Sequence, residues 1–112
     1  ERALAVLDRE PRVVAAISGH AHESSIEPRQ SPAGGYWLVQ TPSLADYPQQ
    51  ARAFRLVETA DGIALETWMI DHSSAGLAAV SRELAYLDAQ GGRPRGFAGE
   101  AEDRNALLYL ER

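Results

Sequence analysis

The stretch of the sequence that decides the fold reads Val13-Val-Ala-Ala-Ile-Ser-Gly-His-Ala-His22. Its first five residues, 13–17, form an unbroken apolar run of strand length. Such runs are typical of strands that are covered on both faces, and a strand of that kind needs a layer of structure on either side. From Ser18 onward the chain is small and polar, so the strand is expected to end in a loop that carries both histidines.

A second informative stretch, residues 54–70, predicts a β-hairpin. Two strand-like runs flank Asp61-Gly62, a dipeptide that supplies positive φ angles to tight hairpin turns. The second run, 63–70, is apolar on both faces apart from Glu66 and Thr67. This pattern favours a strand inside a layered sheet.

Periodicity and helix-ending residues predict the remaining elements. One helix covers 2–9 and ends before Pro11, and a second covers 74–88, with Ser73 or Ser74 as its N-cap and Gly91-Gly92 at its end. The second helix carries an apolar stripe that consists of Leu77, Val80, Leu84 and Leu87. The other segments are a strand at 36–41, an irregular surface segment at 42–50 and a partly extended tail at 91–112. We therefore expect one α/β unit, 1–112, with a mixed sheet and flanking helices.

The composition limits the function classes. Among the 112 residues, 11 basic and 16 acidic side chains give a net charge of −5, which leaves no broad basic surface for nucleic acid or anionic lipid. No apolar run approaches the roughly 20 residues of a membrane span, and no secretory signal is visible. Cysteine is absent, so a metal would be held by histidine and carboxylate side chains.

Two features of the sequence concern its origin. The chain starts at Glu1 and its only methionine is Met69, so we expect that an upstream segment has been removed. Whether the intact protein is cytoplasmic or exported therefore stays open. All 11 basic residues are arginine, a bias that is similar to that of proteins from high-GC bacteria.

The one cluster with the character of a metal site is Gly19-His20-Ala21-His22. Imidazole binds divalent metals through one nitrogen while the other nitrogen donates to an acceptor. In an extended backbone, a spacing of two residues turns both rings toward one side. Gly19 permits a positive φ and a close approach of the backbone to a ligand. The alternative interpretation is a polar turn with two exposed histidines.

These residues resemble a known family. The stretch that ends in Gly19-His20-Ala21-His22 is similar to the last motif of the calcineurin-like metallophosphoesterases, and residues 36–52 with the following strands and Ser81-Arg-Glu-Leu-Ala85 resemble a bacterial branch of that family. The resemblance implies the C-terminal part of a layered α/β/β/α sandwich. It implies that His20 and His22 are ligands, one to each of two divalent ions (Mn, Fe or Zn), in an enzyme that hydrolyses phosphate esters.

The other motifs of that family are absent from the chain. The motifs Asp-x-His, Gly-Asp-x-x-Asp and Gly-Asn-His have no counterpart, and the only asparagine is Asn105, near the end of the chain. The resemblance therefore implies a C-terminal piece, without a catalytic residue of its own and inactive alone. We expect this piece to be free of metal or to bind it weakly, because zinc sites normally take at least three protein ligands. We also expect it to expose interface that promotes self-association.

Two alternatives come from other classes. A small cupin would bind one metal through His20, His22, Glu27 and His72, but Val14 stands where that motif needs glycine, and the second cupin motif is absent. A non-catalytic interaction module is the other alternative, since no complete metal shell is visible.

The remaining conspicuous side chains have ordinary explanations. Trp37, Trp68, Phe54 and Tyr47 are expected to pack in the core and between layers. The stretch that resembles the family also carries Asp46 and Arg52, which would either line the site or be exposed loop charges.

Overall fold

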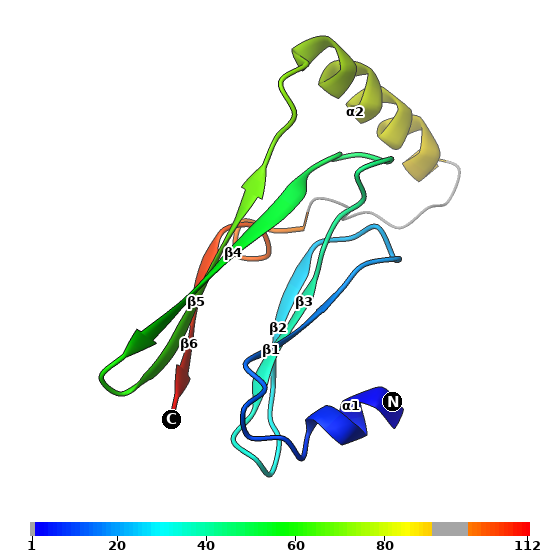
Figure 1. Cartoon of the computed structure of the whole chain (residues 1–112). Coiled ribbons are helices and arrows are strands. Elements are labelled where there is room, and N and C mark those ends of the chain that lie inside the picture. The colour runs from blue at the N-terminus through cyan, green and yellow to red at the C-terminus, as the bar shows by residue number, and fades with distance from the viewer. Residues whose placement is uncertain (1, 91–98) are drawn as a thin grey trace.

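The computed structural model describes residues 2–90 and 99–112 and has a mixed α/β fold (Figure 1). Two helices and six strands are present in these residues, and the strands form two three-stranded sheets. In the chain order, the first part supplies one sheet and the second part supplies the other. The α/β class and the mixed sheet expected from the sequence are confirmed.

The first sheet, which we call sheet A, has the strand order β1-β3-β2. Strand β1 (Ala15–Ser18) runs parallel to β3 (Tyr36–Gln40), and β2 (Ser25–Arg29) runs antiparallel to β3. Strand β1 begins two residues later than the apolar run at 13–17 predicted. The prediction that both faces of this strand are covered is wrong for this chain, since Ile17 is 54% exposed.

The second sheet, sheet B, is antiparallel throughout and has the order β4-β5-β6. Strands β4 (Ala51–Thr59) and β5 (Gly62–Ile70) form the predicted hairpin, which is therefore confirmed. Strand β6 (Ala106–Glu111) pairs with β5, so this part of the expected tail belongs to the sheet. Residues 91–98 of the expected tail, including Gly91-Gly92, lie outside the described residues.

The glycine of the hairpin has a different role from the predicted one. Ala60 and Asp61 form the turn, and Gly62 is already the first residue of β5, without a positive φ. A Cβ atom at Gly62 would lie 2.0 Å from the carbonyl oxygen of Leu110. Glycine is required at this position because β6 approaches the backbone closely, not because the turn needs a left-handed residue.

The core lies between the two sheets. Val39 of β3, Leu65 of β5 and Leu108 of β6 are almost fully buried and form one cluster. Partly buried side chains that pack against this cluster are Ala15, Ile26, Trp37, Phe54 and Ala106. The packing role expected for Trp37 and Phe54 is confirmed, whereas Trp68 is 41% exposed.

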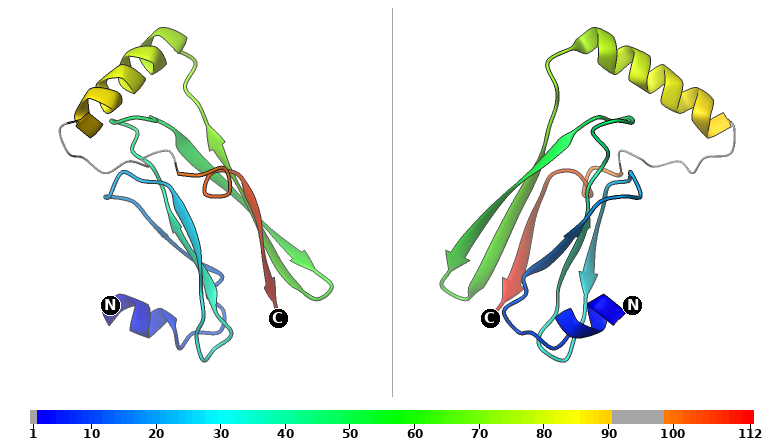
Figure 2. Two further views of the ribbon diagram at one scale, coloured as in Figure 1. Left: turned by 180° about the vertical axis from the view of Figure 1, so that it is seen from behind. Right: turned by 45° about the vertical axis from the view of Figure 1, so that its right-hand side comes forward.

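The two helices lie at opposite ends of the molecule rather than over the face of a sheet (Figures 1 and 2). Helix α1 (Arg2–Leu7) is joined to sheet A through Asp8, the residue that follows the helix. Asp8 accepts two hydrogen bonds from Arg29, at 2.6 and 2.7 Å, and one from the hydroxyl of Tyr36 at 3.0 Å. Helix α2 (Ala75–Gln90) follows β5. The predicted cap of α2 is confirmed, since the hydroxyl of Ser74 accepts from the backbone N–H of Leu77 at 3.4 Å.

The apolar stripe of α2 is exposed. Its four members are Leu77, Val80, Leu84 and Leu87, with exposed fractions of 65, 53, 60 and 54%. The whole chain exposes 7636 Å², whereas about 6,000 Å² is usual for a compact monomer of this mass. Its radius of gyration is 15.9 Å, against about 13 Å for a compact chain of this length. The chain is therefore more open than a typical isolated domain. None of the described helices is long and apolar enough to cross a membrane.

Candidate functional site

The loop that carries the two histidines follows the carboxyl end of β1. Its backbone is not extended as expected: His20 has a φ of 78° and His22 a φ of 60°. Gly19 does not have a positive φ, and a Cβ atom there would make only an ordinary contact, 3.5 Å from the hydroxyl of Thr41. The left-handed positions of this turn thus fall on the histidines themselves, a residue type that adopts this region more readily than most.

The ring of His22 is held by a carboxylate from another part of the chain. Its Nδ1–H donates to Oδ2 of Asp46 at 2.5 Å, and both side chains are 41% exposed. Because a carboxylate only accepts, this contact places the proton of a neutral ring on Nδ1 and leaves Nε2 as a free acceptor. Histidines that bind metals commonly have this arrangement, with one nitrogen on a carboxylate and the other on the ion.

A local turn presents Asp46 to His22. The hydroxyl of Ser43 accepts from the backbone N–H groups of Ala45 and Asp46, at 3.0 and 3.1 Å, and so stabilises a tight turn in the segment 42–50. Asp46 was expected either to line the site or to be an exposed loop charge. Its contact with His22 favours a place beside the candidate site. Ser43 was a local sequence signal for the turn. No spacing rule, however, connects Asp46 to His22, which lies 24 positions away.

The other predicted site residues are dispersed. His20 is exposed and makes no hydrogen bond or ion pair within the described residues. Glu27 is exposed on β2, and His72 follows β5 of the other sheet, where its Nδ1 accepts from the backbone N–H of Ser74 at 3.2 Å. No group of three or more His, Asp or Glu side chains suited to a metal exists in residues 2–90 and 99–112.

This dispersal has two consequences for the metal predictions. The four-ligand cupin set of His20, His22, Glu27 and His72 forms no metal-binding group in residues 2–90 and 99–112, since His72 follows β5 of sheet B while the other three belong to sheet A and the loop after β1. His20 and His22 are two imidazoles of a type that binds divalent metals, the second bonded to Asp46, and they are fewer ligands than a closed site needs.

Arg52, which also lies in the stretch that resembles the family, has a structural role. Its guanidinium donates to the hydroxyl of Thr67 at 3.2 Å, to the carbonyl of Arg104 at 3.1 Å and to the carbonyl of Asp103. Burial lowers the pKa of Arg52. This side chain therefore links sheet B to the turn that precedes β6.

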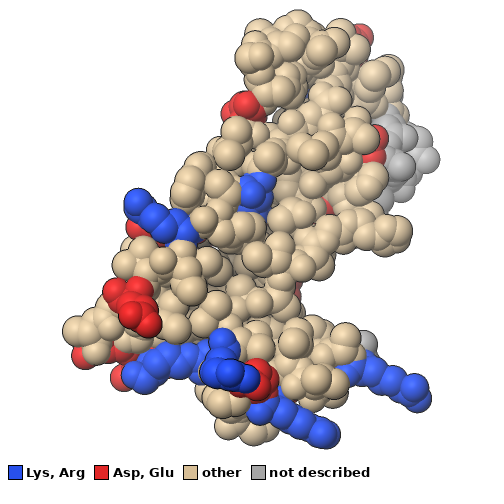
Figure 3. Space-filling view, viewed as in Figure 1, with Lys and Arg blue, Asp and Glu red and all other residues tan. Residues whose placement is uncertain are grey.

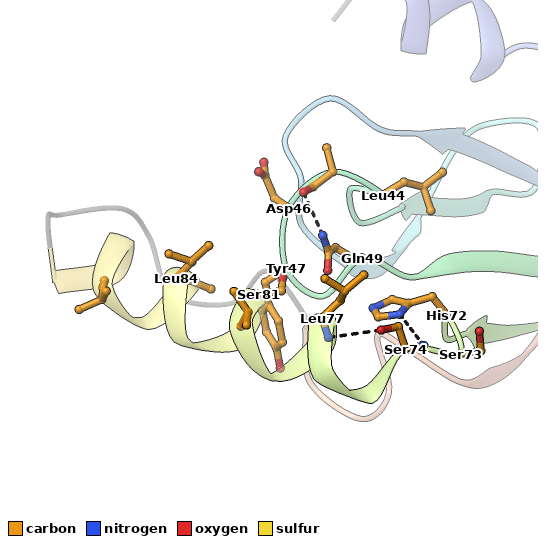
Figure 4. Close-up of a pocket in the computed structure, with 14 residues that line it drawn as sticks. Leu44, Asp46, Tyr47, Gln49, His72, Ser73, Ser74, Leu77, Ser81 and Leu84 are labelled. Carbon is orange, nitrogen blue, oxygen red and sulfur yellow. Dashed lines mark hydrogen bonds between the residues drawn. The ribbon is translucent and has the colours of Figure 1, made fainter.

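A groove of about 930 Å³ lies beside the His22–Asp46 pair (Figure 4). One wall is the segment 44–49 and the other is the exposed stripe of α2, with residues 72–74 at one end. Asp46 belongs both to the lining of this groove and to the contact with His22. The sequence predicted the helix and the irregular segment, but nothing in their spacing indicated that they face each other.

Comparison of the chain with protein-family models, with curated proteins and with solved structures found no match.

Proposed function

We propose that this chain is the C-terminal part of a metal-dependent phosphoesterase similar to the calcineurin-like metallophosphoesterases, in which His20 and His22 supply ligands to a two-metal site. The observation that carries the proposal is the 2.5 Å contact between Nδ1 of His22 and Asp46. It fixes the ring with Nε2 available, as ligation requires. Asp46 lies in the same stretch, 36–52, on which the family resemblance rests.

The exposed apolar surface supports a larger assembly. The register of sheet B places Val57 of β4, Trp68 of β5 and Tyr109 of β6 on the face that points away from the core. Their exposed fractions are 37, 41 and 46%. A soluble monomer rarely leaves a face of this kind uncovered, so further structure packing on sheet B explains it best. The proposal assigns that structure to the upstream part of the same enzyme.

The residues of this chain have limited roles in the proposed reaction. Two bound divalent ions would polarise the phosphoryl group and activate water. His20 and His22 would help to hold these ions, and Asp46 would orient the ring of His22. No residue of the chain is assigned as a catalytic group, so the chain alone is expected to be inactive.

A paramagnetic titration tests the metal half-site directly. Substoichiometric Mn²⁺ is added to the chain, and the broadening of backbone amide NMR signals is mapped. We expect selective broadening around residues 19–22, loss of that effect in His22→Ala, and a roughly 10-fold to 100-fold weaker effect in Asp46→Asn. His72→Ala is the matched control and should behave as the wild type does. Broadening centred on His72 or Glu27 would contradict the proposal.

An activity assay tests the truncated character of the chain. An aryl phosphate is incubated with Mn²⁺ and either this chain or a longer form that carries the upstream sequence. We expect hydrolysis only by the longer form, and its loss in His20→Ala and His22→Ala. Efficient hydrolysis by the 112-residue chain itself would show that the site is complete without further ligands.

A further inference from the structure

Strand β4 is a long edge of sheet B. Its nine residues pair with β5 on one side, and in residues 2–90 and 99–112 no strand pairs with its other side. The other edge strands, β1, β2 and β6, have four, five and six residues, and β2 contains Pro28, which lacks an N–H group. Strand β4 contains neither a proline nor a bulge. Such an edge is a template for a further strand.

The pairing of the sheet shows which backbone groups of β4 point to its open side. The carbonyl oxygen of Asp61 accepts from the backbone N–H of Arg112 at 3.1 Å. The backbone of Asp61 therefore faces β6, and that of Gly62 faces β4, because these directions alternate along a strand. Thr59, the partner of Gly62, faces β5, and so does every second residue before it. The N–H and C=O groups that face the open edge belong to Arg52, Phe54, Leu56 and Glu58.

The sequence of β4 is complementary to itself in one antiparallel register. When two copies pair across a two-fold axis at Arg55, all nine residues have a partner. Arg52 then lies opposite Glu58 of the second copy, and Phe54 lies opposite Leu56. An axis at Phe54 or at Leu56 leaves two end residues of each copy unpaired and removes the arginine–glutamate pair. Charge and length therefore select the register centred on Arg55.

The two arginines that meet at this axis are each neutralised within their own copy. The guanidinium of Arg55 forms an ion pair with Glu66 of β5, and its Nε lies 2.5 Å from Oε2. The axis therefore brings together two positive and two negative charges. In Figure 3, the left border of the molecule, where the hairpin lies, carries both acidic and basic side chains. A surface that is complementary to its own copy needs charges of both signs.

This register also accounts for an exposed side chain on the inner face of sheet B. Leu56 lies on the same face as its partner Leu65, which is buried, yet Leu56 is 56% exposed. The three buried residues of the core cluster come from β3, β5 and β6, so the core ends before the β4 edge. In the symmetric register, Phe54 of the second copy lies beside Leu56 and continues the apolar layer across the edge.

We propose that two copies of this chain form an antiparallel dimer through β4, which joins their B sheets into one six-stranded sheet. The order of strands in that sheet is β6-β5-β4-β4-β5-β6. Because the axis makes the two edges identical, the contact closes at two copies. The proposal is independent of metal binding at His20 and His22, since it uses only sheet B. It leaves the outer face of sheet B and the edge of β1 open.

A single engineered cysteine tests the register, because the chain contains none. In Arg55→Cys the two thiols lie opposite each other at a non-hydrogen-bonded pair, where Cα atoms are about 4.5 Å apart, a distance that a disulfide spans. Mild oxidation should convert this variant into a covalent dimer. Val57→Cys is the matched control on the same strand and face. Residue 57 lies opposite residue 53 of the second copy, so Val57→Cys alone should stay uncrosslinked, whereas its mixture with Ala53→Cys should give the mixed dimer.

A proline tests whether the backbone edge is required. The N–H of Leu56 faces the open side, so Leu56→Pro removes no hydrogen bond between β4 and β5. Sedimentation should show a concentration-dependent dimer for the wild type and only monomer for Leu56→Pro, with unchanged circular dichroism. Glu58→Arg repeats the test without a proline, because it places an arginine opposite Arg52. Leu84→Asp is the control on the exposed stripe of α2 and should leave the dimer intact.

Four results would overturn the proposal. They are a wild-type chain that stays monomeric at its highest soluble concentration, equal crosslinking of Arg55→Cys and Val57→Cys, a dimer that persists in both Leu56→Pro and Glu58→Arg, and assemblies larger than a dimer. A dimer that Leu84→Asp dissociates and Leu56→Pro does not would place the contact on α2 instead of β4.

Discussion

The guanidinium of Arg112 donates from Nη2 to the carbonyl oxygen of Val13 at 2.8 Å, across 99 positions of the sequence. The same nitrogen donates to the carbonyl of Gly35 at 3.2 Å, and Nη1 donates to that of Ala33 at 3.5 Å. These contacts join the end of β6 in sheet B to the loops that lead into β1 and β3 of sheet A. A single side chain therefore supports the packing of the two sheets.

Replacement of Arg112 by alanine is expected to lower the free energy of unfolding by about 1–2 kcal/mol, since several hydrogen bonds from a charged donor are lost. Chemical denaturation followed by circular dichroism measures this change. Arg82→Ala is the control, because Arg82 is exposed on α2, and it should change stability by less than about 0.5 kcal/mol. Equal stability of the two variants would show that the contacts of Arg112 contribute nothing.

The ion pair of Asp8 and Arg29 makes stability dependent on pH. The hydrogen bond from Arg29 lowers the pKa of Asp8 in the folded chain. The contribution is therefore fully present above the unfolded pKa of about 3.9 and is lost as the pH falls through the lower folded value. We expect Asp8→Asn to be less stable than the wild type at neutral pH, and the difference to shrink in acid. Unfolding curves recorded from neutral to acidic pH measure it.

Glu10 provides the control for that experiment. Arg12 lowers the pKa of Glu10 to about 2, first through a side-chain hydrogen bond. Arg12 is 87% exposed and only two positions away, so the pair is screened by solvent and can also form in the unfolded chain. Glu10→Gln should therefore change stability much less than Asp8→Asn does. A larger effect of Glu10→Gln would contradict the role assigned to the Asp8–Arg29 pair.

Two paired leucines of the hairpin should respond differently to truncation. Leu65 is 5% exposed in the core, and its partner in the register, Leu56, is 56% exposed. Leu65→Ala is expected to cost about 2–5 kcal/mol, because it removes buried methyl groups and leaves a cavity. Leu56→Ala should cost less than about 1 kcal/mol. Thermal and chemical unfolding of both variants tests the position of the core.

Two glycines should also respond in opposite directions. A Cβ atom at Gly62 would meet the carbonyl oxygen of Leu110 at 2.0 Å, whereas at Gly76 in α2 it would meet nothing within 4 Å. Gly62→Ala should destabilise the chain, because the added methyl group would make β5 clash with β6. It should leave the rate of turn formation unchanged. Gly76→Ala should stabilise α2 by about 0.5–1 kcal/mol through helix propensity. Hydrogen exchange of β6 amides shows whether Gly62→Ala loosens that strand.

Local sequence patterns predicted the helices and strands of this chain better than they predicted what packs against each of them. The hairpin and α2 follow from alternation, helical spacing and a serine cap, which act over a few residues. The exposure of Leu84 did not follow, because an amphipathic pattern shows that a face is apolar and not what covers it. The roles of Gly19 and Gly62 were misjudged because glycine serves both positive φ and close approach, and only the fold separates these two causes.

The candidate site was predicted in part for the same reason. The histidines could be found from their type and spacing, since two imidazoles after a strand are a chemical signal. Their partner Asp46 lies in a segment without periodicity, and its contact with His22 depends on how β3 and the serine turn are placed in space. The groove depends on the position of α2 opposite segment 44–49, which no pattern within either segment encodes.

The position of β1 in sheet A determines where further structure can be added. Strand β1 pairs with β3 on one side, and within the described residues no strand pairs with its other side. Its backbone N–H and C=O groups there form an open template for another strand. A strand added in parallel would end beside the loop that follows β1, because carboxyl ends of parallel strands meet at one border of a sheet. Such an addition would bring new side chains next to His20 and His22, so completing the sheet and completing the ligand shell would be one event.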